Sequence, residues 1–274
     1  SALELYKGEA DLSRRLVSHM LRGLSFREYL EFYHNLSLDV LQLNDILTNH
    51  TDITSAIVKK VKILPLFNQY LKHGYFPFAK NISEDTIMPR LVQIINTVLE
   101  VDLMFIEGYS ASNIEKIKKL LGVIAQVAPF EPNISSIAEK LKIGRNTVYE
   151  FLKNLKDAGI LNLMNKPCKG INFLQKPDKI YLENTNFQYA FSPANTNLGN
   201  LRETFFVNQL SFSHLVEYSE HSDFLIDNTY TFEVGGKSKT EQQIKYLKNS
   251  FIASDDIEYG NQNKIPLWLF GFLY

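Results

Sequence analysis

The chain has 274 residues, enough for two or three domains, and its hydrophobic content of 45% is ordinary for a soluble globular protein. No apolar run reaches the roughly 18 residues that a membrane-spanning helix needs, and the first residues lack the pattern of a signal peptide. A single cysteine, Cys168, excludes internal disulfides and a thiolate zinc site, and it fits a cytoplasmic protein.

The formal net charge of −1 is unevenly distributed along the chain. Residues 113–169 hold ten Lys and Arg against five Asp and Glu, whereas residues 1–112 and 170–274 are both net negative. A segment that faces DNA phosphates needs such an excess of positive charge. A solvated basic face explains the excess almost as well.

Residues 1–112 have mainly helical patterns. Ser25 precedes an apolar helix face and Glu28 follows three residues later, which is the spacing of a capping box. Further helices are expected over 56–72, with a break at Leu64-Pro65, and over 86–105, because apolar residues recur there at helical spacing.

Residues 133–161 have the pattern of a helix-turn-helix. Apolar spacing predicts a first helix that ends near Leu141 and a second that begins at Arg145. Gly144 is expected to allow the tight turn, and Gly159 to end the second helix. The exposed side of the second helix carries side chains that can reach base edges or phosphates: Arg145, Asn146, Thr147, Tyr149 and Lys153. The alternative is a helical hairpin within a larger core.

The flanking residues extend this pattern to a winged helix over 113–176. A further helix is expected from Ser110 to Ile124, and strands at 160–164 and 171–174 enclose a Pro/Gly turn, which predicts a β-hairpin. Such modules are often reused for protein contacts, so an interaction or assembly scaffold is an alternative to DNA binding.

From residue 177 to 274 the expected elements are those of an α/β domain. Strands are expected at 179–183, 224–226, 230–234 and 265–274, and helices at 198–210 and 240–249. The last strand is so apolar that we expect it to be central and buried on both faces.

Short motifs follow one another along the chain in a fixed order. They are Leu-Glu-Leu at 3–5, Asp-Leu-Ser-Arg-Arg at 11–15, Leu-Ser-Phe-Arg-Glu at 24–28, the segment ending Gly-Tyr-Phe-Pro at 70–77, the winged helix, Leu-Arg-Glu at 201–203 and the acidic motifs at 223–234. In this order they resemble bacterial and archaeal AAA-type ATPases with a C-terminal domain related to the PD-(D/E)xK nucleases. The resemblance implies an α+β multidomain fold: a helical lid-like segment, a winged helix-turn-helix and an α/β restriction-nuclease-like domain.

The phosphate-binding loop of such ATPases, GxxxxGK[ST], has no match here. Gly236-Lys237-Ser238 has the matching end, but Thr231 stands where the first glycine is required. The resemblance therefore implies the C-terminal part of an ATPase whose core, with its ATP and Mg²⁺, lies outside this chain. We expect this part to hold no cofactor of its own. DNA, the missing core and further subunits of an oligomer are the expected partners, without a membrane.

The resemblance also implies a metal-dependent nuclease site. Asp223 is the first acid and Glu233 the second, and with Glu203 as a further ligand they would hold Mg²⁺ or Mn²⁺. In that family a lysine stands two positions after the second acid, but here this position is Gly235.

We expect Lys237 to substitute for the missing lysine across the flexible Gly-Gly link, and Gln242 to add a polar group from the following helix. A loosely held lysine loses the preorganisation that catalysis needs, so weak or absent cleavage is expected. An active metal-dependent nuclease is the alternative.

Overall fold

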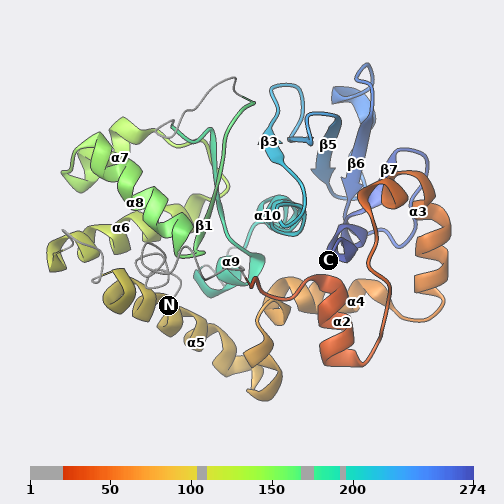
Figure 1. The fold of residues 1–274 in the computed structure, drawn as a ribbon, viewed down its shortest axis with the longest axis horizontal. Coiled ribbons are helices and arrows are strands. Elements are labelled where there is room, and N and C mark those ends of the chain that lie inside the picture. The colour runs from red at the N-terminus through yellow and green to blue at the C-terminus, as the bar shows by residue number, and fades with distance from the viewer. Residues whose placement is uncertain (1–20, 104–109, 168–175, 192–195) are drawn as a thin grey trace, which may run out of the picture.

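The computed structural model describes residues 21–103, 110–167, 176–191 and 196–274, which form an α+β protein with a helical N-terminal part and a C-terminal sheet domain (Figure 1). Within these ranges no helix is both long and apolar enough to cross a membrane. The motifs expected at 3–5 and 11–15, the single cysteine and the strand expected at 171–174 lie outside the described residues.

Between residues 21 and 103 the chain consists of helices joined by short turns. They are α2 (Phe26–His34), α3 (Leu43–Val58), α4 (Ile63–Gln69), the π-helix η1 (Tyr70–Gly74), the 3-10 helix η2 (Pro77–Asn81), α5 (Glu84–Thr97) and the π-helix η3 (Val98–Asp102). The helix expected over 56–72 is broken, as predicted, but the break lies at 59–62, between the end of α3 and the start of α4, and not at Leu64-Pro65. Pro65 is tolerated since it lies in the first turn of α4, where its missing N–H breaks no helical hydrogen bond.

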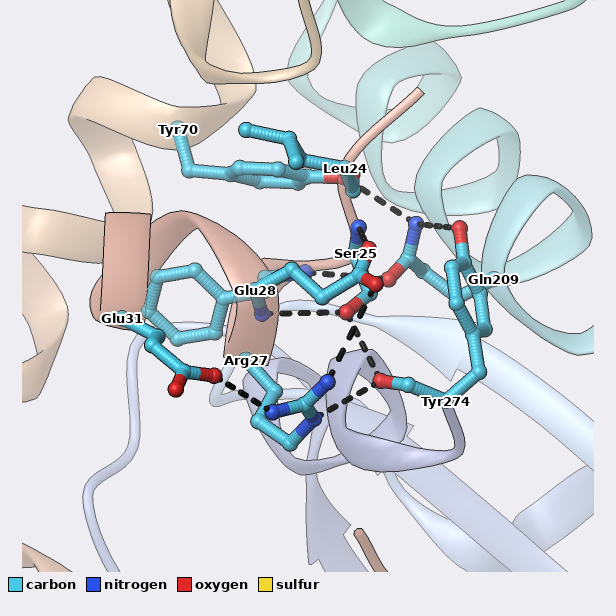
Figure 2. Close-up of polar contacts among 9 residues, drawn as sticks. Leu24, Ser25, Arg27, Glu28, Glu31, Tyr70, Gln209 and Tyr274 are labelled. Carbon is cyan, nitrogen blue, oxygen red and sulfur yellow. Dashed lines mark hydrogen bonds and ion pairs between the residues drawn. The ribbon is translucent and has the colours of Figure 1, made fainter. Parts of the chain in front are cut away.

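The start of α2 confirms the predicted capping box and contacts Tyr274 (Figure 2). Ser25 Oγ accepts a hydrogen bond from the Glu28 N–H at 3.1 Å, and the Glu28 carboxylate accepts one from the Ser25 N–H at 2.9 Å. The same hydroxyl donates to the main-chain oxygen of Tyr274 at 2.8 Å, and Arg27 Nε donates to that oxygen at 3.0 Å. One serine therefore starts the helix and joins it to the C-terminal domain.

The next three helices are those that the sequence predicts. They are α6 (Ala111–Val127), α7 (Ile134–Leu141) and α8 (Arg145–Asp157). One face of α8 is buried through four apolar residues at helical spacing: Val148, Phe151, Leu152 and Leu155. The left-handed residue in the turn before α8 is Lys142, with φ 53°, whereas Gly144 has φ −70° and is the N-cap of α8. The expectation that the turn needs glycine at position 144 for its backbone conformation is therefore wrong.

A two-stranded sheet follows α8. In it β1 (Leu161–Met164) pairs with β2 (Lys179–Leu182) in the antiparallel sense. This corrects the expectation that the strand at 179–183 belongs to the C-terminal α/β domain. On the other side of β2, Ile180 and Phe130 form two main-chain hydrogen bonds with each other, at 3.0 and 3.2 Å. Phe130 lies between α6 and α7. Strand pairing of this kind depends on distant residues, which local periodicity does not reveal.

The C-terminal part contains two helices and a mixed five-stranded sheet. The helices are α9 (Thr185–Phe191) and α10 (Leu198–Leu210), and the strands are β3 (Val216–Tyr218), β4 (Phe224–Ile226), β5 (Tyr230–Gly235), β6 (Ser250–Ser254) and β7 (Lys264–Pro266). They lie in the order β3-β4-β5-β6-β7; pairing is antiparallel from β3 to β5 and parallel from β5 to β7. Asp227 and Asn228 form the predicted turn between β4 and β5, with φ of 51° and 54°.

Two expected elements of this domain are wrong. Instead of a helix at 240–249 there is one 3-10 turn, η5 (Glu241–Gln243). Only Ile244 in this stretch is fully buried, which is too little apolar surface to hold a helix against the sheet. Instead of a strand over 265–274, β7 gives way to the 3-10 helix η6 (Leu267–Phe272), all of whose residues are buried. A continuous apolar run shows burial without distinguishing strand from helix.

The side chains form two hydrophobic cores. The first joins α2, α3, α4 and η1 to α10, the large sheet and η6, and the second joins α5 to α6–α9 and the small sheet. In Figure 1, α9 and α10 lie in the middle, between α6–α8 on one side and the large sheet on the other. The segment expected over 1–112 therefore contributes to both cores.

Helix α10 carries a buried glutamine that connects three parts of the chain (Figure 2). Gln209 is 0% exposed, and its Oε1 accepts from the Phe26 N–H at 3.2 Å. Its Nε2 donates to the hydroxyls of Tyr70 at 3.0 Å and Tyr274 at 3.4 Å. The helical part and the chain's last described residue are thus both hydrogen-bonded to α10.

Replacing this glutamine is expected to destabilise the protein. Gln209→Leu leaves the buried Phe26 N–H without an acceptor, which lowers the free energy of unfolding by about 1–3 kcal/mol. Urea denaturation measures the loss. Gln93→Leu makes the same chemical change at an exposed position of α5 and is expected to shift stability by less than about 0.5 kcal/mol. Equal stability of the two variants would contradict this role of Gln209.

Candidate functional site

Two acidic residues meet where β4 and β5 pair. Asp223 directly precedes β4, and the antiparallel register places it opposite Glu233 on β5. The Asp223 carboxylate accepts a hydrogen bond from the Val234 N–H at 2.8 Å, and Glu233 is only 1% exposed. The structure therefore brings together the two acids that the sequence singles out.

Lys239 supplies a positive charge beside this pair. Its Nζ forms an ion pair with Glu233. Its aliphatic chain covers Gly235, where an added Cβ would lie 2.9 Å from Lys239 Cβ and 3.0 Å from its Cγ and Cδ. Glycine at this position therefore leaves the space through which Lys239 reaches Glu233.

The neighbouring glycine makes room for a second cation. A Cβ on Gly236 would lie 3.1 Å from Arg202 Nη1. Arg202 on α10 is held by Asp255, to which its Nε donates at 2.8 Å. Asp255 follows β6 directly, and its N–H donates to the Gly235 carbonyl at 2.8 Å. The Gly-Gly link is thus held in place and covered by Lys239 and Arg202.

Glu203, also on α10, has two partners from β2. Lys179 Nζ lies 2.6 Å from its Oε2, and the Tyr181 hydroxyl donates to the same oxygen at 2.9 Å. Lys179 and Tyr181 are two residues apart on a strand, so both point to one face. Burial, followed by the charge of Glu203, raises the pKa of the Tyr181 hydroxyl, which therefore stays protonated and donates. We call Glu203, Asp223, Glu233, Lys179, Lys239 and Tyr181 the acid–lysine cluster.

Burial and charge act in opposite directions within this cluster. Burial raises the pKa of Asp223, and the charge of Glu233 adds to this, while the Val234 N–H and the two lysines lower it. Burial lowers the pKa of Lys239, but the carboxylates of Glu233, Asp223 and Glu203 raise it above the ordinary lysine value. Lys239 is therefore held in its charged form.

The cluster does not fit a ready-made centre for Mg²⁺ or Mn²⁺, which prefer several converging oxygen ligands. Glu233 is paired with Lys239, and Glu203 with Lys179. Among the described residues no three acidic, histidine or cysteine groups come together as metal ligands would. The ligand set that the resemblance implies is instead divided between separate ion pairs.

Two residues expected in this site lie outside the cluster. The Lys237 side chain is 71% exposed, and its Nζ lies 3.3 Å from a carboxylate oxygen of Asp256. Gln242 is exposed in η5, because the helix expected to carry it does not form. Lys239, and not Lys237, is the lysine that reaches Glu233.

The residues expected to contact DNA share one helix, α8. Arg145, Asn146 and Lys153 are exposed, while Thr147 and Tyr149 are half-buried. The opposite face of α8 is fixed in the second core. This helix therefore presents an accessible side on which two cations, Arg145 and Lys153, outnumber one acid, Glu150.

Sequence analysis does not identify Lys179, Tyr181 or Arg202 as site residues. The alternation of Lys179 and Tyr181 on a strand is the signal that places them on one face. The sequence feature that could have indicated Lys239 is the Gly-Gly pair, because a glycine at the position expected for the lysine leaves room for a side chain from another position. Arg202 stands in the Leu-Arg-Glu motif at 201–203, but the motif gives it no role in the site.

Comparison with known proteins gives relatives without an established activity. Residues 64–196 match a family described as a domain of unknown function, DUF8612. The chain is similar to two uncharacterized proteins of Methanocaldococcus jannaschii. One is 26% identical over 164 residues, which make up 59% of this chain and 34% of the relative. The other is 26% identical over 210 residues, or 71% of this chain and 45% of the relative. The chain thus spans less than half the length of either relative, and no solved structure matches it.

Removing Lys239 is expected to destabilise the sheet domain. Lys239→Met leaves the buried Glu233 carboxylate without its ion-pair partner, which lowers the free energy of unfolding at pH 7 by about 1–3 kcal/mol. The measurement is urea denaturation, and addition of Glu233→Gln is expected to recover part of the loss.

Lys237→Met is the matched control, because it removes the same charge from an exposed side chain. Its expected effect is below about 0.5 kcal/mol. If both lysine variants lose the same stability, Lys239 does not have the supporting role described here.

Proposed function

We propose that this chain is the DNA-associated C-terminal half of an AAA-type ATPase, with a regulatory or effector role and with weak or no nuclease activity. The observation that carries the proposal is the accessible cationic face of α8, with Arg145, Asn146 and Lys153 exposed. The relatives, which are more than twice as long as the part that this chain spans, support a larger parent protein. The order of the motifs supports an ATPase core as the missing part, where ATP and Mg²⁺ would bind.

The surroundings of α8 support a winged helix-turn-helix. Two residues, Ile143 and Gly144, lie between the C-cap of α7 and the start of α8. The bridge of Phe130 to β2, together with β1, gives a small sheet beside the three helices. In winged-helix modules such a sheet supports a helix that enters the major groove of DNA.

The acid–lysine cluster supports a nuclease-like origin for the sheet domain. Asp223 beside one strand, Glu233 on the next and Lys239 near both match the residue types of a PD-(D/E)xK site. The ion pairs that occupy Glu233 and Glu203 argue against efficient cleavage, because a metal would have to displace the lysines first.

DNA binding is expected to depend on α8. In fluorescence anisotropy with duplex, forked and single-stranded DNA, Arg145→Ala/Lys153→Ala is expected to weaken binding. It should also reduce the slope of log affinity against log salt by about 1 to 2, because two phosphate contacts are lost. Lys59→Ala/Lys60→Ala removes the same charge from exposed positions after α3 and serves as the control.

Full affinity and an unchanged salt slope in the α8 variant would exclude this face as the contact. If the unaltered chain binds none of the three DNA forms, the protein-interaction scaffold becomes the better interpretation.

Cleavage is expected to be weak or absent. Plasmid and branched DNA incubated with Mg²⁺ or Mn²⁺ should be cut no faster by the chain than by Glu233→Ala. Robust cutting that Glu233→Ala abolishes would contradict the proposal and establish the alternative, an active nuclease. Lys239→Ala and Lys237→Ala would then identify the lysine that takes part.

A further inference from the structure

A second polar site lies where the helical part, α8 and β2 meet. A cavity of about 370 Å³ is lined by residues of the segment before α2, the end of α8, β1 and the junction of β2 with α9. None of the acid–lysine cluster lines it. Its volume lies within the range of about 300–1,000 Å³ that is usual for small-molecule pockets. We call it the Arg22 cavity.

Two buried nitrogen atoms of its lining lack a hydrogen-bond acceptor in the described part of the chain: Arg22 Nη1 and Asn184 Nδ2. Asn184 is only 2% exposed, and its Oδ1 accepts from the Phe187 N–H at 3.1 Å. That bond fixes the amide and leaves its nitrogen unpaired. Since buried donors are nearly always paired in proteins, two unpaired donors in one cavity indicate a site where a ligand supplies the acceptors.

Arg22 is placed beside the cavity by its neighbours. Gly23 packs so closely on Tyr75 that an added Cβ would lie 2.4 Å from the ring. The Leu24 N–H donates to the Tyr75 carbonyl at 2.8 Å. These contacts fix the main chain directly after Arg22.

The acidic residues of the lining are compatible with an anionic ligand at slightly acidic pH. Burial raises the pKa of Glu183 to about 7, against the opposing charge of Arg22 and the hydrogen bonds from the side chains of Asn208 and Asn162. At pH 6 the carboxyl is therefore mostly protonated and adds an O–H donor to the lining. Lys156, at the end of α8, adds a positive charge near the half-buried Asp157, the other acidic residue there.

We infer that the Arg22 cavity binds a small molecule through a phosphate or carboxylate group held by Arg22 and Asn184. An oxyanion offers several lone pairs around one centre, so it can accept from both donors at once. Its hydrogen bonds with the guanidinium are charge-assisted and therefore stronger than neutral ones. The inference is independent of DNA binding and goes beyond the proposed function.

Isothermal titration calorimetry of the whole chain at pH 6 tests the inference. Sodium phosphate and sodium succinate are titrated separately, with sodium chloride at matched ionic strength as the reference. Saturable binding of at least one oxyanion is expected. Tighter binding of phosphate would indicate a phosphate-bearing ligand, and tighter binding of succinate a carboxylate.

Arg22→Gln and Asn184→Asp are each expected to weaken this binding about tenfold or more, which corresponds to one lost charge-assisted or buried hydrogen bond. Asn184→Asp keeps the oxygen that accepts from the Phe187 N–H and replaces the donor nitrogen by oxygen. Lys248→Gln removes one positive charge from an exposed position elsewhere and is expected to leave binding unchanged. Circular dichroism checks the fold of each variant, and Asn184→Asp decides if Arg22→Gln does not fold. Absence of saturable binding to both anions, or equal binding by the folded variants and the unaltered chain, would overturn the inference.

Discussion

The fold depends on burying the polar side chains of one helix in the middle of the molecule. One side of α10 packs on the large sheet and another faces the helical part, so the amides of Asn208 and Gln209 have almost no access to water. Besides Gln209, Asn208 Nδ2 donates to the Glu183 carbonyl at 2.8 Å, and Thr204 Oγ1 accepts from Gln188 at 3.0 Å. Apolar contacts alone are not directional. These hydrogen bonds determine which segments lie against α10, because a wrong neighbour would leave a buried amide unpaired.

A similar constraint shapes the end of β5. The two glycines there suggest a loose link, yet the Gly235 carbonyl accepts from Asp255, and the Gly236 carbonyl accepts from the Lys239 N–H at 2.9 Å. The absence of side chains at these positions serves the close approach of Lys239 and Arg202. Two glycines that make the unfolded chain flexible are therefore compatible with an ordered lysine side chain in the folded protein. A Gly-Gly pair does not by itself indicate a disordered site.

Local signals account for the parts of the fold that the sequence predicts. The apolar spacing of α8 and the serines that cap helices at Ser25 and Ser110 are signals that span only a few residues. Helices and their first residues can therefore be predicted from the sequence. The tolerance of Asp227 and Asn228 for a left-handed backbone marks a turn in the same way. The partners of a strand cannot be predicted from such local signals. Strand β2 pairs with β1 and with Phe130, and the residues of β2 themselves indicate neither partner.

The candidate site shows the same limit. Asp223 and Glu233 are readable because their strands are adjacent in sequence and joined by a short turn. Lys239 reaches Glu233 only through the packing of its side chain on Gly235, and Glu203 meets Lys179 only because α10 crosses β2. Sequence reasoning finds acids on consecutive strands; which cation neutralises each one follows from tertiary packing.

The two cores are formed by different parts of the sequence. The second core is formed by residues between 79 and 187, and the first core mainly by the residues on either side of that stretch, with Met164 and Tyr181 as exceptions. The unit that carries α8 is therefore inserted into the other and attached to it at both of its ends. A domain attached by one linker can rotate relative to its neighbour, whereas rotation of a domain attached by two chain segments also moves the neighbouring domain. Any load applied to α8 would accordingly reach the first core along two chain connections, besides the contacts of β2 with Glu203 on α10.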